Sequence, residues 1–142
     1  MANVVNKIVR GTFGRLWVNG RHMANVKEFE AKITANYETV QVNGNFTDQY
    51  RYIGNAIAGT ILLHKTDSYF TTLLAEAFES GVMPSVTIDA RLADLDSNGS
   101  ERIALYDVVF DELTILKFTN GSIGEESVPF KAGAFKVLDT IE

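Results

Sequence analysis

Residues 28–37 read Glu-Phe-Glu-Ala-Lys-Ile-Thr-Ala-Asn-Tyr, and polar and apolar side chains alternate through the whole stretch. A β-strand points successive side chains to opposite faces, so the stretch predicts a strand with one polar and one apolar face. The strand pattern runs from about Leu16 to Val42, interrupted only at Asn19-Gly20, whereas an ordinary strand has about five or six residues. The core of a small chain cannot cover so long a stretch of strand. We therefore expect its polar face to be a working surface, and its edges to pair partly with other copies of the protein.

The composition predicts one folded domain over residues 1–142. Hydrophobic residues make up 46% of the chain, which is enough for a core. The absence of cysteine excludes disulfides, thiolate metal sites and cysteine nucleophiles, and it fits folding in a cytoplasm. The N-terminal residues lack the apolar run of a signal peptide, and no apolar stretch approaches the roughly 20 residues that span a bilayer. The net charge is -5 and the basic residues are scattered, so no phosphate-binding cluster is expected.

The flanking sequence predicts a mainly β fold. We expect two packed antiparallel sheets, as a sandwich or half-barrel, with one flanking α-helix. Asn19-Gly20 predicts a type I′ hairpin turn, and changes in the parity of the apolar residues predict bulges near Lys27 and Glu38. The helix follows from apolar spacing between Phe70 and Phe78, and Gly81 is expected to end it. Further strands are expected over residues 57–65, 86–92, 102–118 with a break near 111–112, and 128–138, which makes six or seven strands.

Two segments have no place in this core. Residues 1–13 are expected to form an extended N-terminal arm. Residues 43–56 are polar, include Tyr50 and Tyr52, and predict the longest irregular loop. Loops of this length are uncommon in small domains and are often functional.

A calcium site is the first chemical candidate. Asp94, Asp96 and Asn98, followed by Gly99, match the first half of a calcium-binding loop, with oxygen ligands at alternate positions. The complete motif has an acidic residue at its twelfth position, where this chain has Leu105. The flanking segments are strands rather than helices, so a polar turn is the favoured interpretation.

The other candidates are histidines and paired acids. His22 and His64 lack the Gly-x-Ser-x-Gly elbow of a serine hydrolase, and a two-histidine metal site is less favoured than solvated or capping histidines. Neighbours on a strand point to opposite faces, so Asp111-Glu112 and Glu125-Glu126 are expected to be solvated turn charges rather than acid–base pairs. The sequence therefore predicts no enzyme and no cofactor.

The order and spacing of many short motifs resemble those of a known family. The chain resembles tail tube proteins of contractile phages of the PBSX type and the inner tube of R-type bacteriocins such as diffocins. The resemblance covers nearly the whole chain, and the motifs that carry it are Gly11, Gly14, Trp17-Val-Asn19-Gly20, Phe29-Glu-Ala-Lys32, Gly44, Gly59-Thr60, Gly81, Pro84, Leu92-Ala-Asp94, Gly99-Ser-Glu101-Arg102, Asp107-Val-Val-Phe-Asp111-Glu112, Glu125-Glu126 and Pro129-Phe130.

The resemblance implies a structural protein. Subunits of this family form stacked hexameric rings whose inner sheets join into one barrel inside a contractile sheath, and sheath contraction drives the tube through a cell envelope. The implied partners are other copies of the chain, a sheath protein, baseplate and tape-measure proteins, and DNA in the channel if the particle is a phage. The implied location is the bacterial cytoplasm during assembly, and then the phage tail or the released bacteriocin particle.

Within that framework the residues predict three surfaces. The polar face of the long strand and of strand 86–92 is expected to line the channel, and its residues are Glu28, Glu30, Lys32, Thr34, Asn36, Thr87, Asp89 and Arg91. The loop 43–56 and the arm 1–13 are expected to contact the next ring, and within the loop Phe46, Tyr50 and Tyr52 can bury apolar area there. Glu76 and Glu79, opposite the apolar stripe of the helix, are candidates for contact with the sheath, and the simpler interpretation is that they keep an exposed helix soluble.

Two alternatives share the predicted fold. A monomeric small-ligand-binding β-barrel would have an apolar internal cavity and would not self-associate. A secretion-system tube component would have the same architecture as the phage tube.

Overall fold

The structure, a computed structural model, describes residues 14–92 and 100–140. These residues form eight strands and one helix, and all strand pairs are antiparallel. In chain order the elements are β1 (Gly14–Val18), β2 (Arg21–His22), β3 (Val26–Val40), β4 (Gln49–His64), α1 (Tyr69–Ser80), β5 (Val86–Leu92), β6 (Glu101–Phe110), β7 (Glu125–Ala132) and β8 (Ala134–Asp139).

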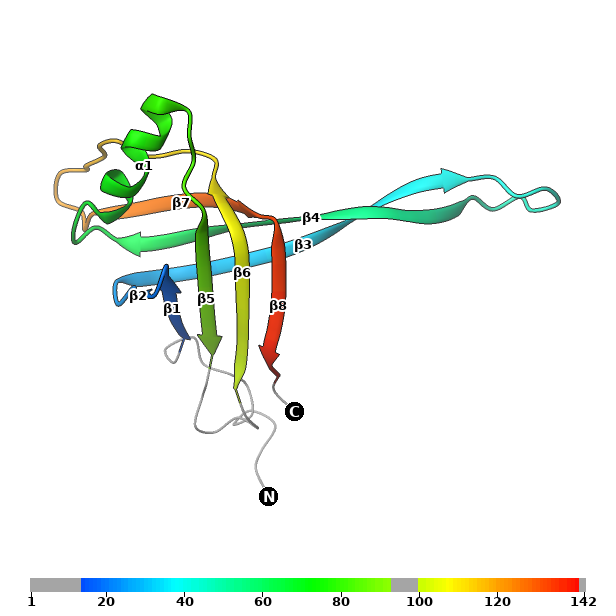
Figure 1. The fold of residues 1–142 in the computed structure, drawn as a ribbon, viewed down its shortest axis with the longest axis horizontal. Coiled ribbons are helices and arrows are strands. Elements are labelled where there is room, and N and C mark those ends of the chain that lie inside the picture. Colours follow the sequence, from blue (N-terminus) through cyan, green and yellow to red (C-terminus); the bar gives the residue numbers. More distant parts are fainter. Residues whose placement is uncertain (1–13, 93–99, 141–142) are drawn as a thin grey trace, which may run out of the picture.

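The strands form two sheets that share β6. The strand order is β2-β1-β5-β6-β7-β4-β3, and β8 pairs with β6 as well. The first sheet holds β2, β1, β5, β6 and β8, and the second holds the end of β6 with β7, β4 and β3. Figure 1 shows β5, β6 and β8 running across the direction of β3, β4 and β7. The predicted fold class, two antiparallel sheets with one flanking helix, is confirmed, and the sheet does not close on itself.

A sharp corner carries β6 from one sheet to the other. Asp107 has a φ of 53°, and the amide of Gly133 donates a hydrogen bond of 3.0 Å to the carbonyl of Tyr106. A Cβ at position 133 would lie 3.1 Å from the Cβ of Asp107, so only glycine passes this closely without displacing its neighbour. The single strand predicted over residues 128–138 is therefore wrong, because the chain bends at Gly133 and divides it into β7 and β8.

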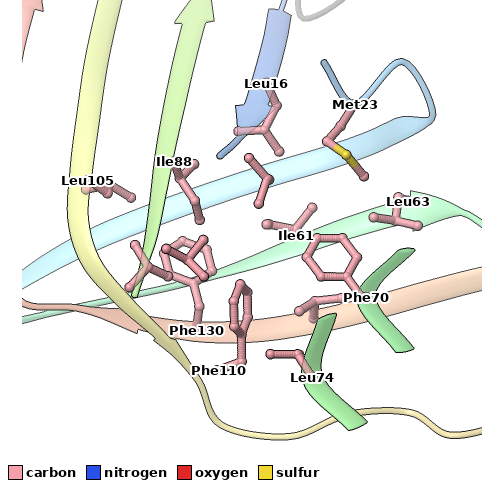
Figure 2. Close-up of a cluster of buried hydrophobic side chains, with 14 of the residues drawn as sticks. Leu16, Met23, Ile61, Leu63, Phe70, Leu74, Ile88, Leu105, Phe110 and Phe130 are labelled. Carbon is pink, nitrogen blue, oxygen red and sulfur yellow. The ribbon is translucent and has the colours of Figure 1, made fainter. Parts of the chain in front are cut away.

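The core lies between the two sheets and under α1. Figure 2 shows Leu16, Ile88 and Leu105 of the first sheet facing Ile61 and Phe130 of the second, with the helix residues Phe70 and Leu74 closing one side. The helix agrees with its prediction and ends at Gly81, which has a φ of 80° and whose amide donates to the carbonyl of Ala77 at 2.8 Å. Alternating apolar residues on every strand thus supply one shared interior.

The predicted turn and bulges are present. Asn19 and Gly20 have φ angles of 52° and 82°, as a type I′ turn requires, and Val18 pairs with Arg21 across it. The β3–β4 register shifts between Val26 and Glu28 and again between Asn36 and Tyr37. The first shift inserts Lys27 into β3, whereas the second inserts a residue into β4. Each bulge changes which residues of the strand pair oppose one another.

Two predicted boundaries are wrong. Residues 49–56 belong to β4 rather than to an irregular loop, so the loop between β3 and β4 is only residues 41–48. They showed no clear alternation because neither face of this part of β4 meets the core. The strand predicted over residues 102–118 ends at Phe110, and residues 111–118 are irregular. Their apolar side chains suggested a strand, but only Leu113 among them packs against the core cluster.

Candidate assembly surface

A two-stranded ribbon projects from the body of the molecule. We define it as residues 33–56, the distal parts of β3 and β4 with the loop between them, and Figure 1 shows it reaching well beyond the other strands. Among the described strands β3 pairs only with β4, so no described strand pairs with its outer edge along its 15 residues. Isolated two-stranded hairpins are marginally stable in water, and free strand edges are sites of association.

The apolar face of the ribbon continues the inner face of the second sheet, and no other described element covers it. Ile33 and Ile57 are directly opposite each other, yet the first is 49% exposed and the second only 7%. Farther out, Tyr37 and Tyr52 are opposite each other with ring centroids 5.9 Å apart, and both are exposed. The face predicted to be dry is thus dry only up to about Ala31, where the body of the molecule ends. Apolar surface of this kind, continuous with a core, marks an interaction site.

The polar face of β3 carries five of the predicted channel residues. Their side chains are exposed on the outer face of the second sheet, and the apolar residues between them in the strand point to the inner face. The five residues are Glu28, Glu30, Lys32, Thr34 and Asn36. Lys32 Nζ and Glu30 Oε1 are 2.9 Å apart, and this contact raises the pKa of Lys32. The pair neutralises itself, so this face has little net charge with which to hold a charged solute.

The remaining three predicted channel residues lie on the other sheet. Thr87 and Asp89 alternate with the buried Val86 and Ile88, so they and Arg91 point outward from the first sheet. The outer faces of the two sheets lie on opposite sides of the core. The predicted channel set is therefore divided between two surfaces, and periodicity alone could not show this because it does not say which sheet a strand joins.

The aromatic and acidic residues predicted for contacts are both on the surface. Phe46 is fully exposed in the loop at the tip of the ribbon, and Tyr50 and Tyr52 are exposed near it on β4. Glu76 and Glu79 are exposed on α1. Their contacts with the next ring and with a sheath stay predictions, since the structure contains a single chain.

The two histidines border the same shallow hollow. His22 lies 5.3 Å from Trp17, measured between ring centroids, while His64 Nδ1 is buried without a hydrogen-bond partner among the described residues. The hollow also contains Asp67, whose carboxylate is ion-paired with Arg21 at 2.7 Å. No group of three histidine, aspartate or glutamate side chains within residues 14–92 and 100–140 is placed to hold a metal ion. The calcium candidate, Asp94, Asp96 and Asn98, and the predicted N-terminal arm, residues 1–13, lie outside the described residues.

The acidic pairs are structural. Glu125 Oε1 lies 2.6 Å from Lys27 Nζ, a contact that lowers the pKa of Glu125, while Glu126 Oε2 lies 3.2 Å from Lys65 Nζ. The prediction of solvated turn charges is wrong for Glu126, which is buried at the inner side of β7. Asp111 lies 3.6 Å from Lys131. Each ion pair ties two strands or segments together, and none converges with a second carboxylate on a cleft.

An open cleft of about 520 Å³ separates the two sheets where β1 and β5 face β3. Apolar residues line much of it, including Leu16, Phe29, Ala31, Ala90 and Ile103. A ligand-binding barrel would bury its ligand in an enclosed pocket, whereas this cleft opens at the side of the molecule where the sheet is incomplete.

The sequence reasoning missed one exposed apolar surface. In the segment between β6 and β7, four large apolar side chains are each about 80% exposed; they are Ile115, Leu116, Phe118 and Ile123. The signal was present as an apolar run, but we assigned that run to a central strand. Within the described residues, no helix is long and apolar enough to cross a membrane.

These features define a class of protein. An open antiparallel β structure whose described residues include an unpaired edge and an uncovered apolar ribbon is typical of a subunit that associates with neighbours.

The sequence identifies the family. The phage tail tube protein family matches residues 3–139, and the chain belongs to it. The chain is 34% identical to the phage-like element PBSX protein XkdM of Bacillus subtilis (strain 168), covering 99% of this chain and 97% of that protein. This family consists of structural tube proteins, not enzymes.

Solved structures share the fold. A chain of the sheath–tube complex of the extracellular contractile injection system PVC, in its extended state, has a TM-score of 0.69 at 10% identity, with 99% of each chain covered. A chain of the baseplate of the anti-feeding prophage, 6-fold symmetrised, has a TM-score of 0.61 at 7% identity, covering 88% of this chain and 90% of that one. The resemblance to tail tube proteins expected from the motifs is thereby confirmed.

Proposed function

We propose that this chain is the subunit of the inner tube of a contractile tail or a tail-like bacteriocin. Copies close into hexameric rings, the rings stack, and the tube encloses a polar channel. The observation that carries the proposal is the ribbon, whose free β3 edge and uncovered apolar face have no partner in the described part of the chain. A neighbouring copy supplies both the hydrogen bonds and the apolar cover, because closure between chains removes sheet edges. The 6-fold symmetrised baseplate that contains a similar chain supports the ring size.

The polar face of β3 lines the channel in this proposal. Glu28, Glu30 and Lys32 sum to a charge of minus one, and Thr34 and Asn36 are neutral. A surface without a cluster of lysine or arginine side chains does not bind the phosphates of DNA tightly, so DNA passes along it without being held. Thr87, Asp89 and Arg91 lie on the opposite face of the molecule and are not part of this channel surface.

The remaining partners follow from the same role. A contractile sheath surrounds the tube, a baseplate nucleates it, and a tape-measure protein sets its length. The tube assembles in the bacterial cytoplasm and ends in the phage tail or the bacteriocin particle. Phe46, Tyr50 and Tyr52 at the end of the ribbon contact a copy in the next ring.

Imaging and labelling test the proposal together. Concentrated protein should form rings or hollow tubes in negative stain and by light scattering. Because the chain has no cysteine, a Thr34→Cys variant carries a single thiol. The labelling reagent is a maleimide attached to a polymer that is too large to enter the channel. In the free subunit the thiol should react with this reagent, and in the assembled tube it should be protected. A strictly monomeric protein at every concentration, or equal labelling of subunit and tube, would refute the proposed channel.

A further inference from the structure

Two arginines face each other on the outer face of the first sheet. Arg91 of β5 is directly opposite Arg102 of β6, and both are exposed. Within residues 14–92 and 100–140, neither guanidinium has an ion pair or a side-chain hydrogen bond. Arg15 of β1 continues the row on one side, opposite Arg91, and Asp139 of β8 ends it on the other. Like charges directly opposite on neighbouring strands destabilise a sheet, so the Arg91–Arg102 pair itself does not stabilise the isolated subunit, although Asp139 opposite Arg102 offsets part of the repulsion.

A second pair of like charges, of the opposite sign, lies on α1. Glu76 and Glu79 are three residues apart, and both are exposed on one side of the helix. Like charges at this spacing repel. Glu79 is also in the last turn, which carries no basic residue and where the helix dipole disfavours a negative charge. Neither carboxylate has an ion pair within residues 14–92 and 100–140. The acidic pair is therefore unfavourable for the subunit on its own.

The two pairs lie at opposite ends of the body. Figure 1 shows α1 near the start of β5, whereas Arg91 is close to the end of β5 and Arg102 close to the start of β6. A contact between them within one chain is thus impossible. A contact between two copies in the same orientation is possible, and such head-to-tail contacts build extended assemblies.

We propose that Glu76 and Glu79 of one copy bind Arg91 and Arg102 of a second copy, in a head-to-tail contact of the tube. This inference rests on the proposed function. Two carboxylates opposite two guanidinium groups form charge-assisted, bidentate hydrogen bonds, and the contact relieves both repulsions at once. A second copy is favoured over the sheath because this chain alone supplies both halves of the contact.

Charge reversal with rescue tests the contact. We expect Glu76→Lys with Glu79→Lys, and separately Arg91→Glu with Arg102→Glu, each to reduce the yield of tubes at least about tenfold. Combining all four substitutions should restore tubes, because the charges are then exchanged. Tube yield of the unmodified protein should also fall between about 50 mM and about 500 mM salt, since exposed charges are screened. Circular dichroism establishes that each variant is folded. Glu112→Lys, at an exposed carboxylate outside the contact, is the matched control and should form tubes normally.

The outcomes separate the two proposals. If the unmodified protein forms no rings or tubes, the proposed function fails. If it forms tubes and both reversed variants do so equally well, only the head-to-tail contact is refuted. Intact tubes that no longer bind sheath, seen with the Glu76→Lys, Glu79→Lys variant alone, would refute the contact and assign this pair to the sheath. Failure of the fourfold variant to recover, with its fold intact, would also overturn the proposal.

Discussion

The ribbon predicts a change that weakens assembly without weakening the fold. Full burial of an aliphatic or aromatic side chain contributes about 1.5–3 kcal/mol. Ile33 still exposes 49% of its surface and Tyr37 exposes 60%, so a neighbouring copy can gain roughly half of that at each position. Replacing both with serine should therefore remove about 1.5–3 kcal/mol from each contact between copies. At 1.4 kcal/mol per factor of ten, association should weaken about 10- to 140-fold.

The matched control is the residue across the ladder. Ile57 is the direct partner of Ile33 but only 7% exposed, so Ile57→Ser should lower the free energy of unfolding by about 2–5 kcal/mol. The Ile33→Ser, Tyr37→Ser variant should lower it by less than about 1 kcal/mol, as at exposed positions. Urea unfolding of the subunit measures the free energy of unfolding, and sedimentation over a range of concentrations measures the strength of association between copies. Equal losses of unfolding free energy in the two variants, or undiminished association of the ribbon variant, would refute the reasoning.

Three further predictions concern other parts of the chain. Gly59→Ala should lower the free energy of unfolding by at least about 1–3 kcal/mol in urea, because its Cβ would lie 2.2 Å from the backbone oxygen of Glu30, which cannot move aside; an unchanged stability would contradict this close approach. Lys27→Met should return the lowered pKa of Glu125 toward its ordinary value of 4.5. The lowered pKa stabilises the fold at pH values above the unfolded-state pKa, and this contribution is lost as the pH falls through the folded-state pKa, so the variant should lack this small pH-dependent stabilisation. An NMR titration of Glu125 that is the same in the variant would exclude Lys27 as the cause. Leu116→Ser with Phe118→Ser should leave unfolding within about 0.5 kcal/mol of the unmodified protein, because both side chains are largely exposed, while reducing self-association or sheath binding in pull-down assays; a large loss of stability would show that they pack in the subunit.

The sequence predicted elements whose patterns come from the core. Phe70 and Leu74 repeat at helical spacing because one side of α1 packs on the sheets, and Val86 and Ile88 alternate because one face of β5 is buried. The Asn19-Gly20 turn was predictable because few residues tolerate two positive φ angles in succession.

Patterns were less informative where the subunit has no core. Residues 49–56 have both faces in solvent, so they carry no alternation and were mistaken for a loop. Ile115, Leu116 and Phe118 look like core residues in sequence, but in the subunit they face solvent. The division of the predicted channel residues also depends on how β6 joins the sheets, and this is a long-range property. In each case the missing information concerns tertiary or intersubunit contacts, which local periodicity does not report.

The shared strand β6 has a mechanical consequence. A sandwich of two separate sheets resists sliding only through contacts between side chains, and such layers shear when loaded along one face. In this chain the corner at Asp107 passes covalent backbone from one layer to the other. A force applied to either sheet is therefore carried to the other through the covalent backbone of β6, which makes each subunit stiffer than two separate sheets would be.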